Sequence, residues 1–90
     1  MIMTIEQLET FLAVAEHKGF HHAAQKLYLT QPSVSSRIKT LEKELNVSLF
    51  VRHGRYISLS EQGLKLLPYA IGIIRLYDEA RGALNGQTLG

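Results

Sequence analysis

The stretch that decides the fold lies at residues 30–45 and reads TQPSVSSRIKTLEKEL. Thr30 before Gln31-Pro32-Ser33 is a strong helix start, because a threonine hydroxyl accepts hydrogen bonds from the first turn and proline fits there. Apolar residues then recur at spacings of four, three and four, on one face of a helix: Val34, Ile38, Leu41 and Leu45. We therefore expect a helix that is capped by Thr30, ends at Asn46 and buries one face.

The opposite face of this helix is small, polar and basic. Its side chains are Ser36, Lys39, Thr40 and Lys43, flanked by Ser33 and Arg37. Such groups let a helix lie close to base edges and phosphates, whereas bulky or acidic ones do not. In the first turn, Gln31 has the amide geometry that pairs with adenine, and Pro32 can contact a thymine methyl group. This face is therefore a candidate for the major groove of duplex DNA.

Two shorter helices are expected upstream. The first spans about 5–17, with Thr4 as its N-cap, and Gly19 breaks its pattern. The second spans about 21–27 and contains the small pair Ala23-Ala24, which lets another helix pack closely. Two short helices joined by a tight turn are typical of a helix-turn-helix, whose second helix enters the major groove. We place this motif at about residues 20–39.

Downstream of Asn46 the periodicity changes. β-prone residues flank His53-Gly54, which predicts a two-stranded hairpin, or wing, at about 49–59 with these two residues as its turn. Ser60 then caps a long helix over about 61–84. Its apolar residues form two rows: Leu66, Ala70, Ile73, Tyr77, Ala80 and Leu84 in the first, and Leu64, Leu67, Ile71 and Ile74 in the second. Two apolar rows need two surfaces to pack against. We expect the second row to close the core and the first row to pair with a second copy of the chain.

Composition narrows the class of function. A chain of 90 residues forms one small domain, too short for a core plus a roomy catalytic cleft. With no cysteine and no arranged nucleophile, acid and base, we predict no catalytic residue, no metal and no cofactor. His17 and His21 are four apart, but Gly19 between them interrupts the helical spacing of a metal pair. With no secretion signal and no bilayer-length apolar run, we expect a cytoplasmic protein without a membrane partner.

The charge is unevenly distributed. The net charge is only +2, yet between Lys18 and Arg55 there are seven lysines and arginines and only two acidic residues. His21, His22 and His53 lie in the same segment and can add charge near a polyanion. A basic centre between neutral or acidic flanks suggests that nucleic acid is contacted by the middle of the chain.

The combined pattern resembles the N-terminal domain of LysR-type transcriptional regulators over nearly the whole chain. The matching stretches are LETFLAVA at 8–15, Gly19-Phe20 with Ala23-Ala24 and Leu27, TQPSVS at 30–35, Ile38, Leu41-Glu42, Leu45, LFVR at 49–52, Gly54-Arg55, and Leu59-Ser60 with Gly63. The resemblance implies a mainly α winged helix-turn-helix, with three helices and a two-stranded β-wing over 1–60. A linker helix over 61–85 would pair with its twin, and 86–90 would begin a linker or be a frayed end.

The resemblance also implies a function. It describes a bacterial regulator of transcription that binds pseudo-palindromic operator DNA as a homodimer, or a higher oligomer at full length, at the nucleoid. A small-molecule effector would act only through a C-terminal effector-binding domain, which we expect to be missing from this chain.

Individual residues receive roles from this comparison. Gln31, Pro32, Ser33 and Ser35 should lie in or at the major groove, and we add Ser36 and Arg37 to this set. Arg52 and Arg55 should belong to the wing, near phosphates or the minor groove. We expect the remaining contacts to the DNA backbone and at the wing from His21, Thr30, Lys39 and His53.

Two positions depart from the family pattern. The family often has Arg or Lys directly after Ser35, where this chain has Ser36, so we expect base contacts there to weaken or to move to Arg37. After Phe20 the family usually has Ser or Thr, which caps the helix and touches a phosphate. This chain has His21, which binds a phosphate best when protonated.

An alternative is a winged-helix module that binds protein. Its basic face would then meet an acidic partner, and it would show little preference among DNA sequences. A further alternative, a fragment of an enzyme, is not supported by any arrangement of catalytic residues in the sequence.

Overall fold

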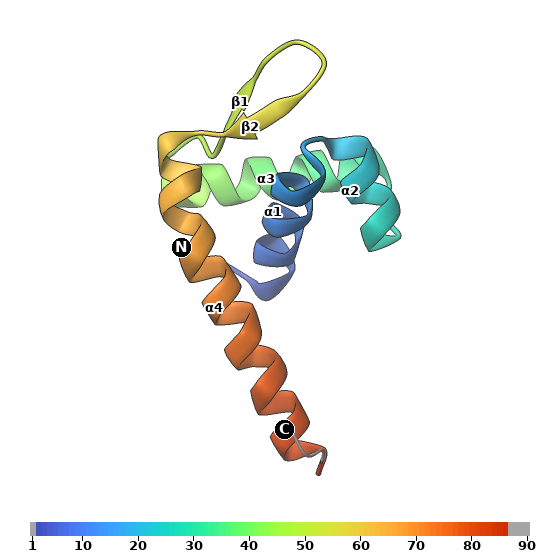
Figure 1. Ribbon diagram of the computed structural model, residues 1–90, viewed down its shortest axis with the longest axis vertical. Coiled ribbons are helices and arrows are strands. Elements are labelled where there is room, and N and C mark those ends of the chain that lie inside the picture. Colours follow the sequence, from blue (N-terminus) through green and yellow to red (C-terminus); the bar gives the residue numbers. More distant parts are fainter. Residues whose placement is uncertain (1, 87–90) are drawn as a thin grey trace.

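Four helices and one hairpin make up the part of the chain that the computed structural model describes, residues 2–86. They follow in the order α1 (Ile5–His17), α2 (Phe20–Leu27), α3 (Gln31–Leu45), β1 (Phe50–Arg52), β2 (Ile57–Leu59) and α4 (Glu61–Leu84). In Figure 1 the first three helices cluster together, the hairpin projects on one side of them, and the end of α4 extends away on the other. The predicted fold class, a mainly α winged helix-turn-helix with a long last helix, is confirmed.

The core lies around α1, against which α2, α3 and α4 all pack. Leu8, Phe11 and Val14 of α1 are buried. They meet the small pair of α2 and the predicted apolar face of α3, whose buried members are Val34, Ile38 and Leu41. The face of α3 that the 3.6-residue period assigned to the core is therefore the face that packs, which leaves its opposite face to solvent.

Three of the four helices begin as their sequences predict. Thr4 Oγ1 accepts a hydrogen bond from Gln7 N at 3.1 Å, and Gln7 Oε1 accepts one from Thr4 N at 2.9 Å. Thr30 Oγ1 accepts from Ser33 N at 3.2 Å at the start of α3. These hydroxyls satisfy N–H groups that have no partner within the first turn of a helix.

The junction between α1 and α2 differs from the expectation. Helix α2 begins at Phe20, one residue earlier than predicted, and its N-cap Gly19 makes no side-chain cap. Gly19 is extended (φ −179°), whereas Lys18 takes the left-handed conformation that ends α1 (φ 54°). Helix α1 ends at His17 as predicted, but the residue in the left-handed conformation for which glycine is preferred is Lys18 and not Gly19. His21 lies inside the first turn and caps nothing.

The first strand of the wing spans the residues expected, Phe50–Arg52, whereas the second strand is shorter and the loop longer than the sequence suggested. Phe50 pairs with Leu59 and Arg52 with Ile57 in an antiparallel register. This pairing leaves four residues, 53–56, in the loop, which His53 N–H closes by donating to the Tyr56 carbonyl oxygen at 2.8 Å. The predicted two-residue turn is therefore wrong, and Tyr56 belongs to the loop.

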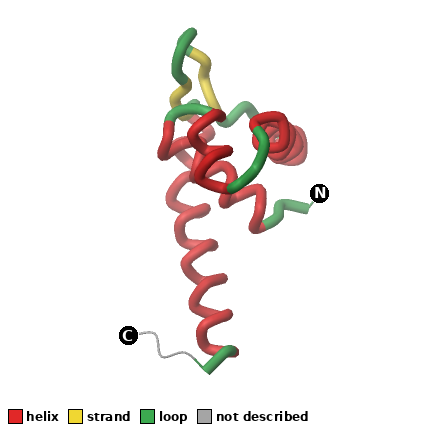
Figure 2. The backbone as a smooth tube through the Cα atoms, turned by 90° about the vertical axis from the view of Figure 1, so that its right-hand side faces the viewer, coloured by secondary structure: helices red, strands yellow, loops and turns green. Residues whose placement is uncertain are grey.

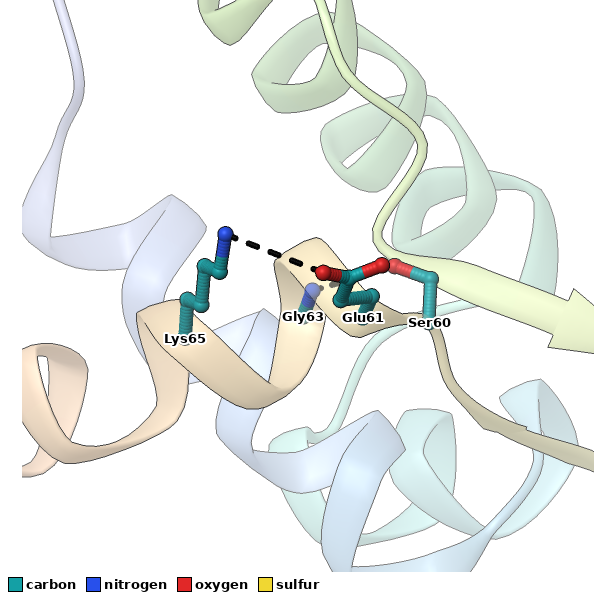
Figure 3. A network of polar contacts seen from close by, with 4 residues as sticks. All are labelled: Ser60, Glu61, Gly63 and Lys65. Atoms are coloured by element: carbon teal, nitrogen blue, oxygen red, sulfur yellow. Dashed lines mark hydrogen bonds and ion pairs between the residues drawn. The ribbon is translucent and has the colours of Figure 1, made fainter.

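Figure 3 shows the first turn of α4, which Ser60 ties to the loop between α3 and β1. Ser60 Oγ accepts from Gly63 N at 3.0 Å and donates to the Ser48 carbonyl oxygen at 2.6 Å. The exposed pair Lys65–Glu61, at 3.9 Å, adds little stability in water. Gly63 packs so closely that a Cβ there would overlap the Leu49 carbonyl oxygen. This contact fixes where α4 leaves the domain.

The apolar rows of α4 are divided differently from the prediction. Ala70 is fully buried, and Leu66, Leu67 and Ile74 are packed against the core. Beyond Ile74 every residue of α4 except Gly82 is exposed, and Figure 2 shows this part extending away from the other helices. Ala70 and Leu66, expected to contact a second copy, therefore serve the domain's own core, against which α4 packs. Of the predicted tail at 86–90, only Gly86 lies within the described residues.

Candidate nucleic-acid interface

The outer face of α3 is open. Its exposed residues include Gln31, Pro32, Ser33, Ser36, Lys39, Thr40 and Lys43. Ser35 and Arg37, at the two flanks of the helix, are partly buried. No bulky apolar or acidic side chain therefore stands between this face and a surface that approaches it.

The two carboxylates of the basic segment are used inside the domain. Glu42 Oε2 accepts from Leu49 N at 2.7 Å, which ties the end of α3 to the start of the wing. Glu44 Oε1 accepts from Gln7 Nε2 at 3.0 Å on the side of α1. Within residues 2–86 the only ion pair is the one in α4, so no acidic side chain pairs with the cations of this segment. The excess of positive charge seen in the sequence is thus found at the surface of the domain.

The first turn of α3 is rigid. The Thr30 hydroxyl accepts from Ser33 N and donates to Ser33 Oγ at 2.8 Å. Both hydroxyls predicted to contact DNA are therefore held by each other, which fixes the exposed Gln31 and Pro32 beside them. A fixed first turn costs less ordering entropy when it binds.

Arg37 lies on the flank that faces α1. Its Nη1 is 3.5 Å from Thr10 Oγ1, and Thr10 in turn donates to the Glu6 carbonyl oxygen at 2.7 Å. The predicted shift of base contacts from Ser36 to Arg37 therefore requires the guanidinium to leave Thr10. In the structure Ser36 is exposed, whereas Arg37 is half-buried.

The wing is fixed to the helical core by aromatic side chains. Phe50 packs against Phe11 at a ring distance of 5.5 Å and lies edge-on to Phe20 at 6.5 Å. The Arg52 guanidinium stands over the Phe20 ring, 5.1 Å from its centroid, which holds the charge at the surface. A hollow of about 110 Å³ separates the wing from α3, and both Ser35 and Lys39 line it.

The side chains of the wing loop also contact one another. The His53 ring stacks on Tyr56 at 4.8 Å with an interplanar angle of 18°. His53 Nε2 is 2.7 Å from Ser58 Oγ. Gly54 (φ 80°) lets the loop turn here, and leaves Arg55 exposed next to it.

A cleft of about 330 Å³ gathers residues that are far apart in the sequence. It lies where the start of α2, the start of α3 and the wing meet. His21, Gln31, Arg52 and Arg55, all predicted DNA contacts, line it. So do three residues that the prediction left out: Lys18, His22 and Tyr56. They were missed because the signal is spatial, with Ile57 N–H donating to the Lys18 carbonyl oxygen at 3.4 Å to bring the wing to this junction.

Other kinds of site receive no support from the described residues. Between residues 2 and 86 no three His, Asp or Glu side chains gather in a way that could hold a metal ion. No helix in this range has both the length and the apolarity to cross a bilayer.

Several known proteins are similar to this chain. An HTH-type regulator of Azotobacter vinelandii from the ibpB-leuC intergenic region is 47% identical over 92% of the chain. HdfR of Salmonella newport is 48% identical over 88% of it, and YxjO of Bacillus subtilis 43% over 88%. The chain spans 58% of the length of the first of these relatives and 27–28% of the other two.

Solved structures are similar along almost the whole chain. The BenM DNA-binding domain in complex with catB site 1 DNA has a TM-score of 0.88 at 32% identity, and covers 92% of this chain and 93% of its own. The CbnR DNA-binding domain with DNA has a TM-score of 0.87 at 32% identity, covering 93% and 97%. OxyR of Corynebacterium glutamicum has a TM-score of 0.91 at 36% identity. The match covers 96% of this chain and 27% of the OxyR chain.

A family model matches residues 5–64, which include every element from α1 to the first turn of α4. The family is described as one of regulatory proteins, and the relatives are named as HTH-type transcriptional regulators. The chain therefore belongs to the bacterial regulatory helix-turn-helix proteins of the lysR family.

Proposed function

We propose that this domain binds duplex DNA to regulate transcription, with α3 in the major groove and the wing on the backbone or in the minor groove. The observation that carries the proposal is the open, small and basic face of α3, whose two neighbouring carboxylates are both engaged inside the domain. The likeness to two domains solved in complex with DNA supports DNA binding. Operator binding would place the protein at the nucleoid, in the cytoplasm.

A salt series tests this proposal. Binding of the chain to a pool of random duplexes is measured by gel shift, followed by selection of the tightest sequences. A dimer contacting six to ten phosphates should lose about 10³–10⁵ in affinity between 50 and 200 mM salt, because each neutralised phosphate releases counterions. Absence of binding to any duplex at 50 mM salt contradicts the proposal.

The alternative, a module that binds an acidic protein, gives a different result in the same experiment. Its basic face would still attract DNA at low salt, but every duplex would bind equally. Enrichment of one sequence after repeated selection therefore decides between the two functions, because base readout alone produces it.

We expect Gln31 and Arg52 to contribute in different ways. Gln31→Ala should cost about 1–3 kcal/mol on the selected duplex and relax the preference at one or two base pairs, because a bidentate contact to a base is lost. Arg52→Ala should weaken binding to all duplexes alike and flatten the salt slope, because a phosphate contact is lost. Affinities of both variants for the selected and a scrambled duplex measure this. The same profile for both variants would refute the division of roles.

We further propose that the domain acts as a dimer in which the exposed face of α4 meets a second copy. Ile73, Tyr77, Ala80 and Leu84 of the predicted row remain exposed, with Tyr69 and Leu76 beside them. Large exposed apolar patches often mark sites of protein interaction. The unit over 1–60 would then read one half-site of a pseudo-palindrome and the helix over 61–85 would hold the pair together. Because the relatives are longer, we assign any small-molecule effector to the part they have in addition.

A further inference from the structure

The tip of the wing is held together by three side chains that belong to one face of the hairpin. His53 follows the last residue of β1 and Tyr56 precedes the first residue of β2, so the two lie opposite each other. The His53 ring stacks on Tyr56 at 4.8 Å, and His53 Nε2 is 2.7 Å from Ser58 Oγ. The His53 N–H also donates to the Tyr56 carbonyl oxygen at 2.8 Å. We call His53, Tyr56 and Ser58 the wing-tip cluster.

This cluster does not contribute to the core of the domain. The wing is attached to the helices through its opposite face, where Ile57 is buried and Phe50 packs against the core. His53 is exposed, and Tyr56 is 54% exposed, in a hairpin that projects away from the helices (Figure 1). The contacts within the cluster therefore order the wing loop, and the rest of the domain does not depend on them.

Arg55 lies in the middle of this loop and has no support of its own. The Arg52 guanidinium is held over the Phe20 ring at 5.1 Å. Arg55, by contrast, takes part in none of the cation–ring contacts or ion pairs found within residues 2–86. The reach of its guanidinium is consequently set by the loop backbone, which turns at Gly54 (φ 80°) and is closed by the cluster.

We propose that the wing-tip cluster positions Arg55 for DNA, and that His53 and Tyr56 make no contact with the duplex themselves. The proposal rests on the proposed function, in which the wing reaches the DNA backbone or the minor groove. A loop that is ordered before binding loses less conformational entropy in the complex, so the cluster lowers the cost of bringing Arg55 to the duplex. His53, which the sequence suggested as a DNA contact, is then a positioning residue.

The first experiment measures the order of the loop in the free chain. Backbone order parameters at Gly54 and Arg55 should be near 0.85 in the parent and should fall below about 0.6 in Tyr56→Ala, because the stack is lost. Tyr56→Phe keeps a ring and should keep the parent's values. Both variants should unfold at the parent's Tm, because Tyr56 lies outside the core. Unchanged order parameters in Tyr56→Ala overturn the proposal without any use of DNA.

The second experiment is a cycle of substitutions measured on one selected duplex. Tyr56→Ala should weaken binding about fivefold, the cost of ordering a loop side chain on binding, and Tyr56→Phe should bind like the parent. Arg55→Ala should weaken binding about tenfold and lower the salt slope by about one. When Arg55 is already alanine, Tyr56→Ala should cost less than about 1.5-fold, because no side chain is left to position.

His53→Ala gives an independent check of the stack. It should weaken binding as much as Tyr56→Ala does, and the two together should bind no more weakly than either alone, because each removes the same ring contact. A larger loss in the double variant would mean that the two rings act separately, which contradicts the proposal.

The remaining outcomes separate the proposal from the function on which it rests. Fully additive effects of Tyr56→Ala and Arg55→Ala, or weaker binding by Tyr56→Phe, would show that Tyr56 contacts the duplex itself, and the proposal would be wrong. If Arg55→Ala bound like the parent, the cluster would have nothing to position, and the proposal would fail while DNA binding stood. If the parent chain bound no duplex at low salt, the proposed function itself would fail.

Discussion

Gly63→Ala should destabilise the domain by about 3 kcal/mol and lower its Tm by roughly 12–24 °C. The new Cβ would overlap the Leu49 carbonyl oxygen and lie 2.9 Å from Leu59 Cδ2. The backbone of Leu49 cannot retreat freely, because its carbonyl oxygen accepts from Ser60 N at 2.9 Å and its N–H donates to Glu42. Thermal and urea unfolding of the free domain measure the loss.

Gly72→Ala is the matched control. Gly72 lies in the same helix, but a Cβ there would have nothing within 4 Å. Alanine should therefore raise the stability by about 0.5–1 kcal/mol, because it lowers the entropy of the unfolded chain. Equal effects of the two substitutions would show that helix propensity, rather than contact with Leu49, governs position 63.

Leu76→Glu should convert the proposed dimer to a monomer and weaken binding to a duplex with two half-sites about 100-fold or more. Leu76 is 66% exposed in the single chain, so the change should leave the fold intact. In the proposed dimer it would bury an unpaired carboxylate, and each domain would then bind its half-site alone. Sedimentation gives the oligomeric state, and gel shifts with one and two half-sites give the affinities.

Leu64→Glu provides the comparison. Leu64 is 59% exposed in the same helix but lies on a different side of it, outside the face proposed to meet a second copy. This variant should remain a dimer and lose little affinity. If Leu76→Glu also remained a dimer at the parent's concentration, the proposed pairing through α4 would be wrong.

Helix limits were predictable because they depend on local chemistry. Thr4, Thr30 and Ser60 each precede a helical apolar pattern, and each accepts the capping hydrogen bond in the structure. Where the prediction failed, distant contacts decided the geometry. The wing loop has four residues because Arg52 pairs with Ile57, and Ile57 is held by the end of α1. Local turn preference alone favoured the shorter loop.

Part of the candidate site could also be predicted from the sequence, and part could not. The outer face of α3 follows from a helical wheel, since its core face is strongly apolar. The cleft does not, because Lys18, His22 and Tyr56 meet only after the wing folds back on α1. The rows of α4 show the same limit: periodicity finds the apolar residues, but only the crossing with α1 decides that Ala70 is covered and Tyr77 is not.

Because α4 is divided into a core part and a partner part, its length sets both the distance and the rotation between the two parts. One end of the helix is fixed in the core by Ala70, and most of the proposed partner surface lies beyond it, from Ile73 to Leu84. Each residue inserted between the two parts would turn the second by about 100° relative to the first. An insertion of seven residues, close to two full turns, would preserve the orientation, whereas one of two residues would rotate the surface to nearly the opposite side. During evolution, insertions and deletions in this helix should therefore keep the rotation between its two parts more strictly than substitutions keep its sequence.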